Sequence, residues 1–206
     1  MNRALLIALC LSGGAASAAP SQQVLDKIDA AAKDSHSLSA TFTQKNRMKL
    51  FRQELGQKGR LYFRAPRQIR WEYTQPDASL LVLDGMKATM SSPGAAPQVF
   101  DLDKDATMRA IFDQLLTFVG GGSIAQAQAA YDIETPGNPS EPTLQLTPKA
   151  GGAIAKAFMK ITLAFDKKTQ VRKITLVERN GDEKEITFDK LDKNGRLPAD
   201  AFSAGK

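Results

Sequence analysis

The chain has 206 residues, enough to form one large domain or two small ones with a hydrophobic core. Hydrophobic residues make up 42% and charged residues 24%, which excludes a disordered or fibrous chain. The 28 Lys and Arg outnumber the 22 Asp and Glu, but the two signs are interspersed and no basic block suggests a nucleic-acid partner.

The first 18 residues have the order of a secretory signal peptide. Arg3 supplies a positive start, Ala4–Leu11 is a short apolar run, and small residues at 16–18 suit a cleavage site. The run is too short to span a membrane. The only cysteine, Cys10, lies within it. We therefore expect an exported mature chain, residues 19–206, with neither a disulfide nor a thiolate nucleophile.

The mature chain begins with one predicted helix and continues mostly as strands. Apolar residues recur at helical spacing over about Ser21–Asp34, with Ser21 as the N-cap. From Leu38 the period changes to two, which indicates short antiparallel strands joined by hairpins. Asp84-Gly85 and Asn180-Gly181 suit two-residue hairpin turns. Strands are expected around Leu38–Thr43, Leu61–Phe63, Ile69–Tyr73, Leu80–Leu83, Lys87–Ser91, Gln98–Leu102, Tyr131–Glu134, Thr143–Leu146, Phe158–Phe165, Val171–Val177 and Glu185–Phe188.

Two helices interrupt this run of strands. Asp105–Phe118 carries an apolar stripe, and Ser123 could cap a shorter helix to about Gln128. Gly120–Gly122 separates them and could act as a flexible joint. Inserted helices of this kind must lie on a face of the sheet or over its open end. We predict a single α+β domain, mainly β.

Motifs for catalysis or metal binding are weak. The sole histidine, His36, lies in a Ser-rich turn, where we interpret it as a solvated residue. Asp101, Asp103 and Asp105 resemble the start of a calcium loop, but Ala106 stands where the turn glycine belongs. They are better explained as acidic residues before a helix N-terminus. We expect no enzyme activity, no cofactor and no metal site.

The most informative segment is Gly59–Tyr73. Alternation places Leu61 and Phe63 on one face, and Ile69, Trp71 and Tyr73 on one face of the next strand. With other segments in the same order, this run resembles the outer-membrane lipoprotein carrier protein (LolA) family. The matching segments are Ser37-Leu38-Ser39-Ala40-Thr41-Phe42-Thr43-Gln44-Lys45, Gly59–Pro66, Trp71 with Thr74-Gln75-Pro76-Asp77, Leu80–Gly85, Leu144–Lys149 and the closing strands to Phe202.

The resemblance implies an incomplete, strongly curved antiparallel β-barrel whose apolar concave face is covered by helices acting as a lid. Such a protein is periplasmic and monomeric. It accepts acylated lipoproteins from an ABC-type release complex in the inner membrane and passes them to an outer-membrane receptor. Physical reasoning agrees, because acyl chains in water cost about 0.8 kcal/mol per methylene and an open apolar hollow needs a cover.

The candidate lipid-binding residues are apolar or aromatic side chains of the strands and of the second helix. They are Phe42, Leu61, Phe63, Ile69, Trp71, Tyr73, Leu80, Val82, Met90, Met108, Ile111, Phe112, Leu115 and Leu116. We place Ile69 at the mouth of the hollow. The family usually has an arginine, before the strand-ending proline, that ties lid to barrel; Ala65 stands there, between Arg64 and Arg67. We assign the latch to Arg64, although strict alternation turns it to the opposite face.

Two alternatives remain open. The first keeps the fold and changes the cargo to a glycolipid, phospholipid or polyprenyl chain, or makes the protein a sensor of mislocalised lipoproteins. The second is an envelope scaffold whose sheet face is simply core. A carrier predicts an apolar cavity lined by the residues above, whereas a scaffold predicts that their side chains interdigitate without a void.

Overall fold

The structure is a computed structural model that describes residues 21–50, 53–119 and 123–203. The expected signal peptide (residues 1–18) and the expected joint (120–122) lie outside the described residues. Within the described part, eleven strands form a single antiparallel sheet. The strands are β1 (Ser37–Met48), β2 (Gln53–Arg64), β3 (Gln68–Gln75), β4 (Ser79–Asp84), β5 (Lys87–Ser91), β6 (Gln98–Asp101), β7 (Tyr131–Glu134), β8 (Thr143–Pro148), β9 (Phe158–Phe165), β10 (Val171–Glu178) and β11 (Glu183–Lys193).

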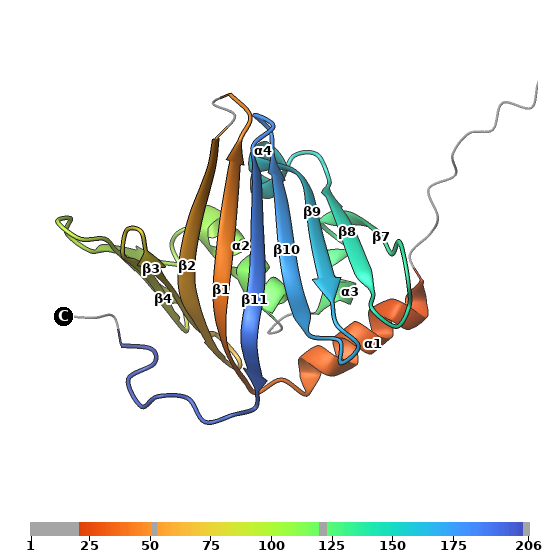
Figure 1. Cartoon of the computed structure of the whole chain (residues 1–206), viewed down its shortest axis with the longest axis horizontal. Coiled ribbons are helices and arrows are strands. Elements are labelled where there is room, and N and C mark those ends of the chain that lie inside the picture. Colours follow the sequence, from red (N-terminus) through yellow and green to blue (C-terminus); the bar gives the residue numbers. More distant parts are fainter. Residues whose placement is uncertain (1–20, 51–52, 120–122, 204–206) are drawn as a thin grey trace, which may run out of the picture.

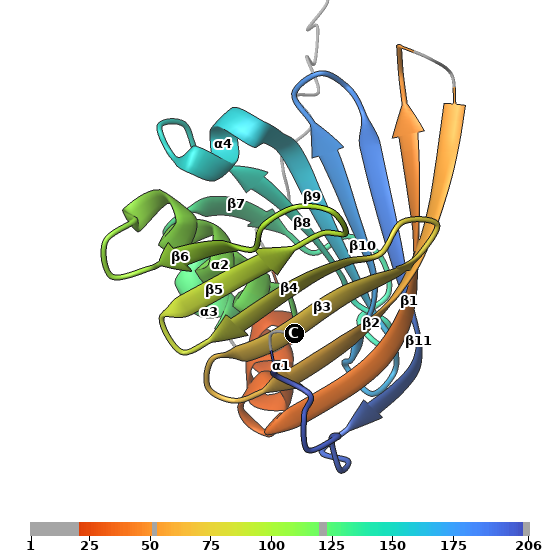
Figure 2. The same ribbon diagram turned by 90° about the vertical axis from the view of Figure 1, so that its left-hand side faces the viewer.

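The sheet is open, and its strand order explains why. The order is β6-β5-β4-β3-β2-β1-β11-β10-β9-β8-β7, so the first and last strands of the chain pair in the middle. The short strands β6 and β7 form the two edges and do not pair with each other. The sheet curves strongly, so that the two halves face one another across the helices (Figures 1 and 2). This is the expected incomplete barrel.

Among the described residues, four helices accompany the sheet: α1 (Gln22–Lys33), α2 (Ala106–Val119), α3 (Ile124–Ala127) and α4 (Ala153–Ala157). Helices α2 and α3 come between β6 and β7 in the chain and lie inside the curve of the sheet (Figure 2). Helix α1 lies across one end of the hollow, beside α3 (Figure 1). The helices therefore cover the concave face, as the inserted apolar stripe requires.

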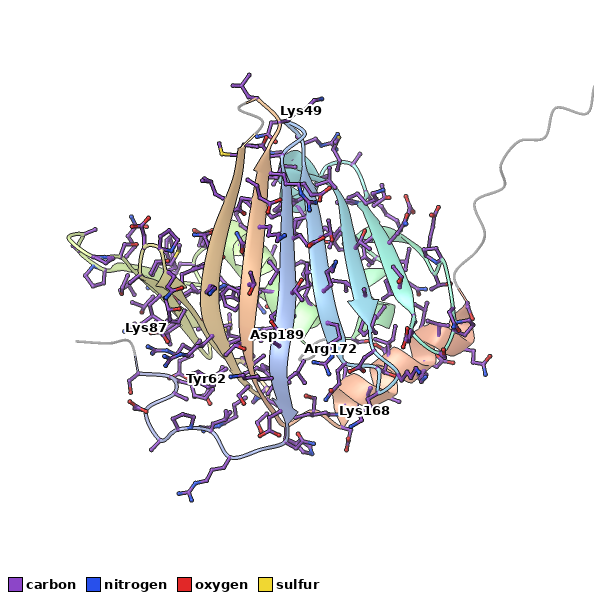
Figure 3. All side chains as sticks on the ribbon, in the orientation of Figure 1. Lys49, Tyr62, Lys87, Lys168, Arg172 and Asp189 are labelled. Carbon is purple, nitrogen blue, oxygen red and sulfur yellow. The ribbon has the colours of Figure 1, made fainter. Side chains whose placement is uncertain are left out.

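Alternation along the strands builds a core on the concave side. Along β1, the side chains of Leu38, Ala40, Phe42 and Gln44 are buried, while the residues between them are half-buried. The buried strand residues form one cluster with Phe112, Leu116, Phe118 and Val119 of helix α2 and with residues of α1 and α3. Figure 3 shows the opposite, convex face, where Tyr62, Arg172 and Asp189 point away from the helices.

Several local details differ from expectation. Helix α4 was not predicted, because five residues carry too little of a period to be recognised. Ser21 precedes α1 but its side chain makes no capping bond. The turn between β4 and β5 consists of Gly85 and Met86, one residue later than predicted, and β10 and β11 are joined by four residues, 179–182. The glycines of both turns have positive φ, +60° at Gly85 and +86° at Gly181.

Candidate functional site

An apolar pocket opens at one end of the concave face. Its volume is about 350 Å³, within the range of about 300–1,000 Å³ that small-molecule sites occupy. Its walls come from β3, β4, β5, β11 and helix α2, and Met90, which is 43% exposed, connects it with solvent. The pocket is lined by Trp71, Tyr73, Ser79, Leu80, Leu81, Met90, Ser91, Ser92, Leu115 and Ile186.

Aromatic rings in tilted and edge-to-face contact support Trp71 and Tyr73 in the wall of this pocket. The Trp71 ring lies 4.7 Å from the Phe42 ring and 6.0 Å from the Phe188 ring, measured between centroids. The Phe42 ring also meets Tyr73 edge to face at 5.3 Å. Phe42 can lie flat across β2 because its cross-strand partner is Gly59, where a Cβ would overlap the ring. Rings at these distances gain from their tilted and edge-to-face geometry.

Helix α2 fills most of the remaining hollow. Phe112 and Leu116 are each only 3% exposed and belong to the same cluster as the strand residues. Beyond them, a second cavity of only about 50 Å³ remains between α1, the end of α2 and the strands. In this closed arrangement an acyl chain could enter the larger pocket, but it could not extend along the whole concave face unless α2 moved.

The concave face becomes polar beside this pocket, where Gln44 pairs with the lining residue Ile186. Gln44, only 4% exposed, donates through Nε2 to Asn46 Oδ1 at 2.7 Å and to Gln57 Oε1 at 3.1 Å. Asn46 Nδ2 also donates to Gln57 Oε1 at 2.9 Å, and the Tyr73 hydroxyl donates to Gln44 Oε1 at 2.8 Å. Burial raises the pKa of Tyr73, against smaller opposing effects of the neighbouring Trp71 and Gln44 side chains.

Among the residues that the structure describes, one ion pair joins helix α2 to the barrel. Nη1 of Arg67 lies 2.7 Å from Oδ1 of Asp113, in the middle of α2. Nε of the same guanidinium donates to the Gly85 carbonyl at 3.2 Å, so the turns before β3 and after β4 hold it in place. Its other nitrogen, Nη2, is buried without an acceptor among the described residues. The ion pair therefore has good geometry, but one nitrogen of the guanidinium group lacks a hydrogen bond.

Aspartate side chains accept hydrogen bonds at the N-terminal ends of helices α2 and α3. Asp105 caps α2 by accepting from the backbone N–H of Thr107 at 3.1 Å and of Met108 at 2.9 Å. Asp29 of α1 accepts from Ser123 Oγ at 2.9 Å and from the backbone N–H of Ile124 at 2.6 Å. Ser123 thus ties α3 to α1 rather than capping it. The Tyr131 hydroxyl of β7 donates to Gln114 Oε1 of α2, and burial raises the pKa of Tyr131.

The structure brings only part of the expected lipid-binding set into the pocket. Trp71, Tyr73, Leu80, Met90 and Leu115 line it. A second group is buried or partly buried within the core cluster: Phe42, Leu61, Phe63, Ile69, Met108, Phe112 and Leu116. Ile111 is 41% exposed, on the outer side of α2.

Ile69 and Val82 are not where the sequence analysis put them. Ile69 is fully buried and does not line the mouth. Val82 pairs with Arg70 on the convex face, because the inward positions of β4 are Leu81 and Leu83, opposite Trp71 and Ile69. Leu81 and Ile186 line the pocket but were missed. An unbroken apolar run such as Leu80–Leu83 carries no alternation, so the sequence could not tell which pair points inward.

Arg64 makes a contact other than the expected latch. Alternation turns it to the convex face, where its guanidinium carbon lies 4.9 Å from the centroid of the Phe202 ring. Nearby, Arg70 Nη1 donates to the Ser203 carbonyl at 2.9 Å. Arg64 therefore holds the C-terminal segment against the barrel, and the arginine that reaches helix α2 is Arg67.

Other chemistry-bearing residues have ordinary surroundings. His36 is exposed in the turn after α1. Asp101 pairs with Lys104 at 2.9 Å, which lowers the pKa of its carboxyl group, and Asp105 serves as the cap of α2. Within residues 21–50, 53–119 and 123–203, no three His, Cys, Asp or Glu side chains are grouped as metal ligands. None of the helices in this part of the chain is both long and apolar enough to cross a membrane.

An open, curved sheet with helices over an apolar concave face defines a half-barrel class of protein, with its pocket between sheet and helix. Residues 33–204 match the family model of the outer membrane lipoprotein carrier protein LolA, and the chain belongs to this family.

Named relatives agree with this assignment. The chain is 26% identical over 201 residues to the outer-membrane lipoprotein carrier protein of Methylibium petroleiphilum, covering 98% of this chain and 92% of that one. It is 30% identical over 148 residues to the protein of the same name from Xanthomonas oryzae pv. oryzae, covering 70% and 66%. Among solved structures, the fold is similar to MucB, with a TM-score of 0.55 and 18% identity over 94% of this chain and 64% of MucB.

Proposed function

We propose that this protein is a periplasmic carrier that binds the acyl chains of lipoproteins released from the inner membrane and delivers them to the outer membrane. The apolar pocket between Trp71 and Leu115 is the observation on which this proposal rests. The names of the relatives supply the cargo class. The protein would act by binding rather than by catalysis, as a monomer, with an inner-membrane ABC-type release complex and an outer-membrane receptor as partners.

In this proposal, helix α2 is a lid that yields to the cargo. Withdrawing Phe112 and Leu116 from the core would cost about 1.5–3 kcal/mol each, or about 3–6 kcal/mol together. Each buried acyl methylene contributes about 0.8 kcal/mol, so about four to eight methylenes offset the opening. The helix side chains and the acyl chain would occupy the same hollow in turn. An empty carrier then keeps its apolar surface covered, and a loaded one covers its cargo.

Release is as necessary as binding, and the lining suits it. The pocket is lined by apolar side chains, among them Leu81, Met90, Leu115 and Ile186. Their van der Waals contacts are non-directional, so a cargo can lose them a few at a time while it forms contacts with a receptor. The sequence carries no phosphate-binding loop. The direction of transfer would therefore come from the partners: a release complex that drives loading and a receptor that binds the acyl chains more tightly.

The direct test is to purify the protein from the periplasm and examine it by native mass spectrometry, followed by organic extraction. We expect adducts with the masses of acylated lipoproteins. The Met90→Glu variant places a charge at the exposed rim of the pocket and should lose them. Val99, which is 57% exposed on β6 and does not line this pocket, offers a matched control in Val99→Glu. Adducts of free lipid only would redirect the proposal to another lipid cargo, and a carrier without any adduct would contradict it.

A further inference from the structure

The indole N–H of Trp71 is a buried donor without an acceptor. Trp71 is 6% exposed, and its Nε1 makes no hydrogen bond with any residue that the structure describes. Nearly all buried polar groups in native proteins are hydrogen-bonded, so a lone buried donor calls for an explanation. The other buried nitrogens of this kind belong to Arg67 and Gln114, and neither residue lines the pocket. Trp71 does line it.

The neighbouring polar groups are already bonded to one another. The Tyr73 hydroxyl donates to Gln44 Oε1. The indole N–H is near enough to the Tyr73 oxygen to lower the pKa of Tyr73, but the contact falls outside hydrogen-bond geometry. The Gln44 amide donates to Asn46 and Gln57. The Tyr73 oxygen keeps a lone pair, but neither it nor the amides of this cluster meets the Trp71 N–H in hydrogen-bond geometry. Within the pocket wall, the indole is the aromatic donor left for a ligand.

Trp71 also stands at a boundary on the concave face. Leu61 and Leu81, its partners on the two neighbouring strands, flank it with apolar side chains. Along β3, the residue two positions earlier, Ile69, is apolar and fully buried. On the other side, Tyr73 leads to the buried amides of Gln44 and Gln57. An acylated ligand has the same division, with apolar chains joined through a carbonyl group to a polar head. The boundary between apolar and polar residues on the concave face would lie at Trp71, where the carbonyl group of the ligand would also lie.

We propose that the Trp71 N–H donates a hydrogen bond to a carbonyl oxygen of the cargo, at the acyl ester or amide where a fatty chain joins its polar head. This inference rests on the proposed function and refines it. Acyl chains would then be fixed in depth and direction, with their methylenes among the apolar side chains and their head toward Gln44 and Gln57. Trp71 would make the carrier selective for acyl-linked over ether-linked chains.

The test compares two probes that differ only in these carbonyl groups: dipalmitoylglycerol and 1,2-di-O-hexadecylglycerol. Each competes with a fluorescent fatty acid for the protein. We expect the wild type to bind the ester about three- to tenfold more tightly, the effect of one net hydrogen bond. Because Trp71 is the only tryptophan, replacing it biosynthetically with 3-benzothienylalanine removes the N–H and keeps the ring. This substitution, and Trp71→Phe, should equalise the two affinities.

Tyr131→Phe is the control, since it removes a buried hydrogen bond to Gln114 outside the pocket and should leave the ratio unchanged. Equal binding of ester and ether by the wild type would overturn this inference while leaving the carrier proposal in place. A preference that survives removal of the N–H would overturn the role of Trp71. Failure of the wild type to bind either probe would instead contradict the carrier proposal itself.

Discussion

Arg67 and Asp113 form the direct ionic link between the barrel and helix α2, with 2.7 Å between Nη1 and Oδ1. The arginine belongs to the turn between β2 and β3, and the carboxylate lies near the middle of the helix. An ion pair at Asp113 restrains the part of α2 that carries Leu115, which lines the pocket, and Phe112 and Leu116, which fill the hollow. Because the side chains of Arg67 and Asp113 are 27% and 46% exposed, solvent weakens the link, which would suit the movement of α2 that the proposed function requires.

Breaking this link should loosen helix α2. We expect Arg67→Ala to speed amide hydrogen exchange in α2 about two- to fivefold, which corresponds to the loss of about 0.5–1 kcal/mol for a partly exposed ion pair. Exchange mass spectrometry on the full chain measures this. Arg64→Ala is the matched control, since Arg64 contacts Phe202 and not α2. Faster exchange in α2 of the Arg64 variant, with none in the Arg67 variant, would return the latch to Arg64.

Gly59 should be intolerant of any side chain. A Cβ there would overlap the ring of Phe42 and the backbone oxygen of Glu72. We expect Gly59→Ala to lower the free energy of unfolding by about 1–3 kcal/mol, the usual cost of overpacking, as measured by urea denaturation. Gly56, on the same strand, has no neighbouring atom within 4 Å of such a Cβ. Gly56→Ala should therefore be close to neutral, and equal losses in both variants would show that close packing is not the cause.

Charges at Ile69 and Met90 should have different consequences. Ile69 is fully buried, so Ile69→Glu should destabilise the fold by more than about 4 kcal/mol and yield little folded protein. Met90 is 43% exposed at the pocket, so Met90→Glu should leave the melting temperature within a few degrees of the wild type and weaken binding of a fluorescent fatty acid about tenfold. A folded Ile69→Glu protein with selectively impaired binding would place the entrance at Ile69 after all.

Two tyrosines, the buried Tyr131 and the partly buried Tyr73, should make the fold sensitive to alkali. Burial raises the pKa of Tyr73 and Tyr131 above the ordinary value of 10.0, because each phenolate would be poorly solvated. A raised folded-state pKa contributes stability that is complete below pH 10 and is lost as the pH rises through the folded-state values. We expect the unfolding free energy to fall above about pH 10. Absorbance of tyrosinate at 295 nm, followed together with circular dichroism, should show a late titration phase accompanied by unfolding.

Much of the fold follows from local patterns in the sequence. Each expected strand is present, and the apolar stripe of Asp105–Phe118 became helix α2, Ala106–Val119, because alternation and helical spacing are recorded in neighbouring residues. Of the residues predicted to bind lipid, Trp71, Tyr73 and Leu115 are among those that line the pocket. Helix α4 was too short to carry a recognisable period, and the precise turn between β4 and β5 depended on which residue took positive φ.

The tertiary structure alone decided which side chains meet. Leu81 faces Trp71 and Val82 faces the convex side of the sheet. The apolar run Leu80–Leu83 has no alternation that would indicate this, so the register of pairing with β3 decides which residues face inward. Arg67 reaches Asp113, 46 residues along the chain. Gln44 of β1 can be buried because Gln57 of β2 and Tyr73 of β3 bond to its amide. Such partners lie far apart in sequence, and only the register and curvature of the sheet bring them together. The sequence by itself thus determined the elements and the apolar character of the hollow, while strand pairing determined its pocket, its latch and its polar boundary.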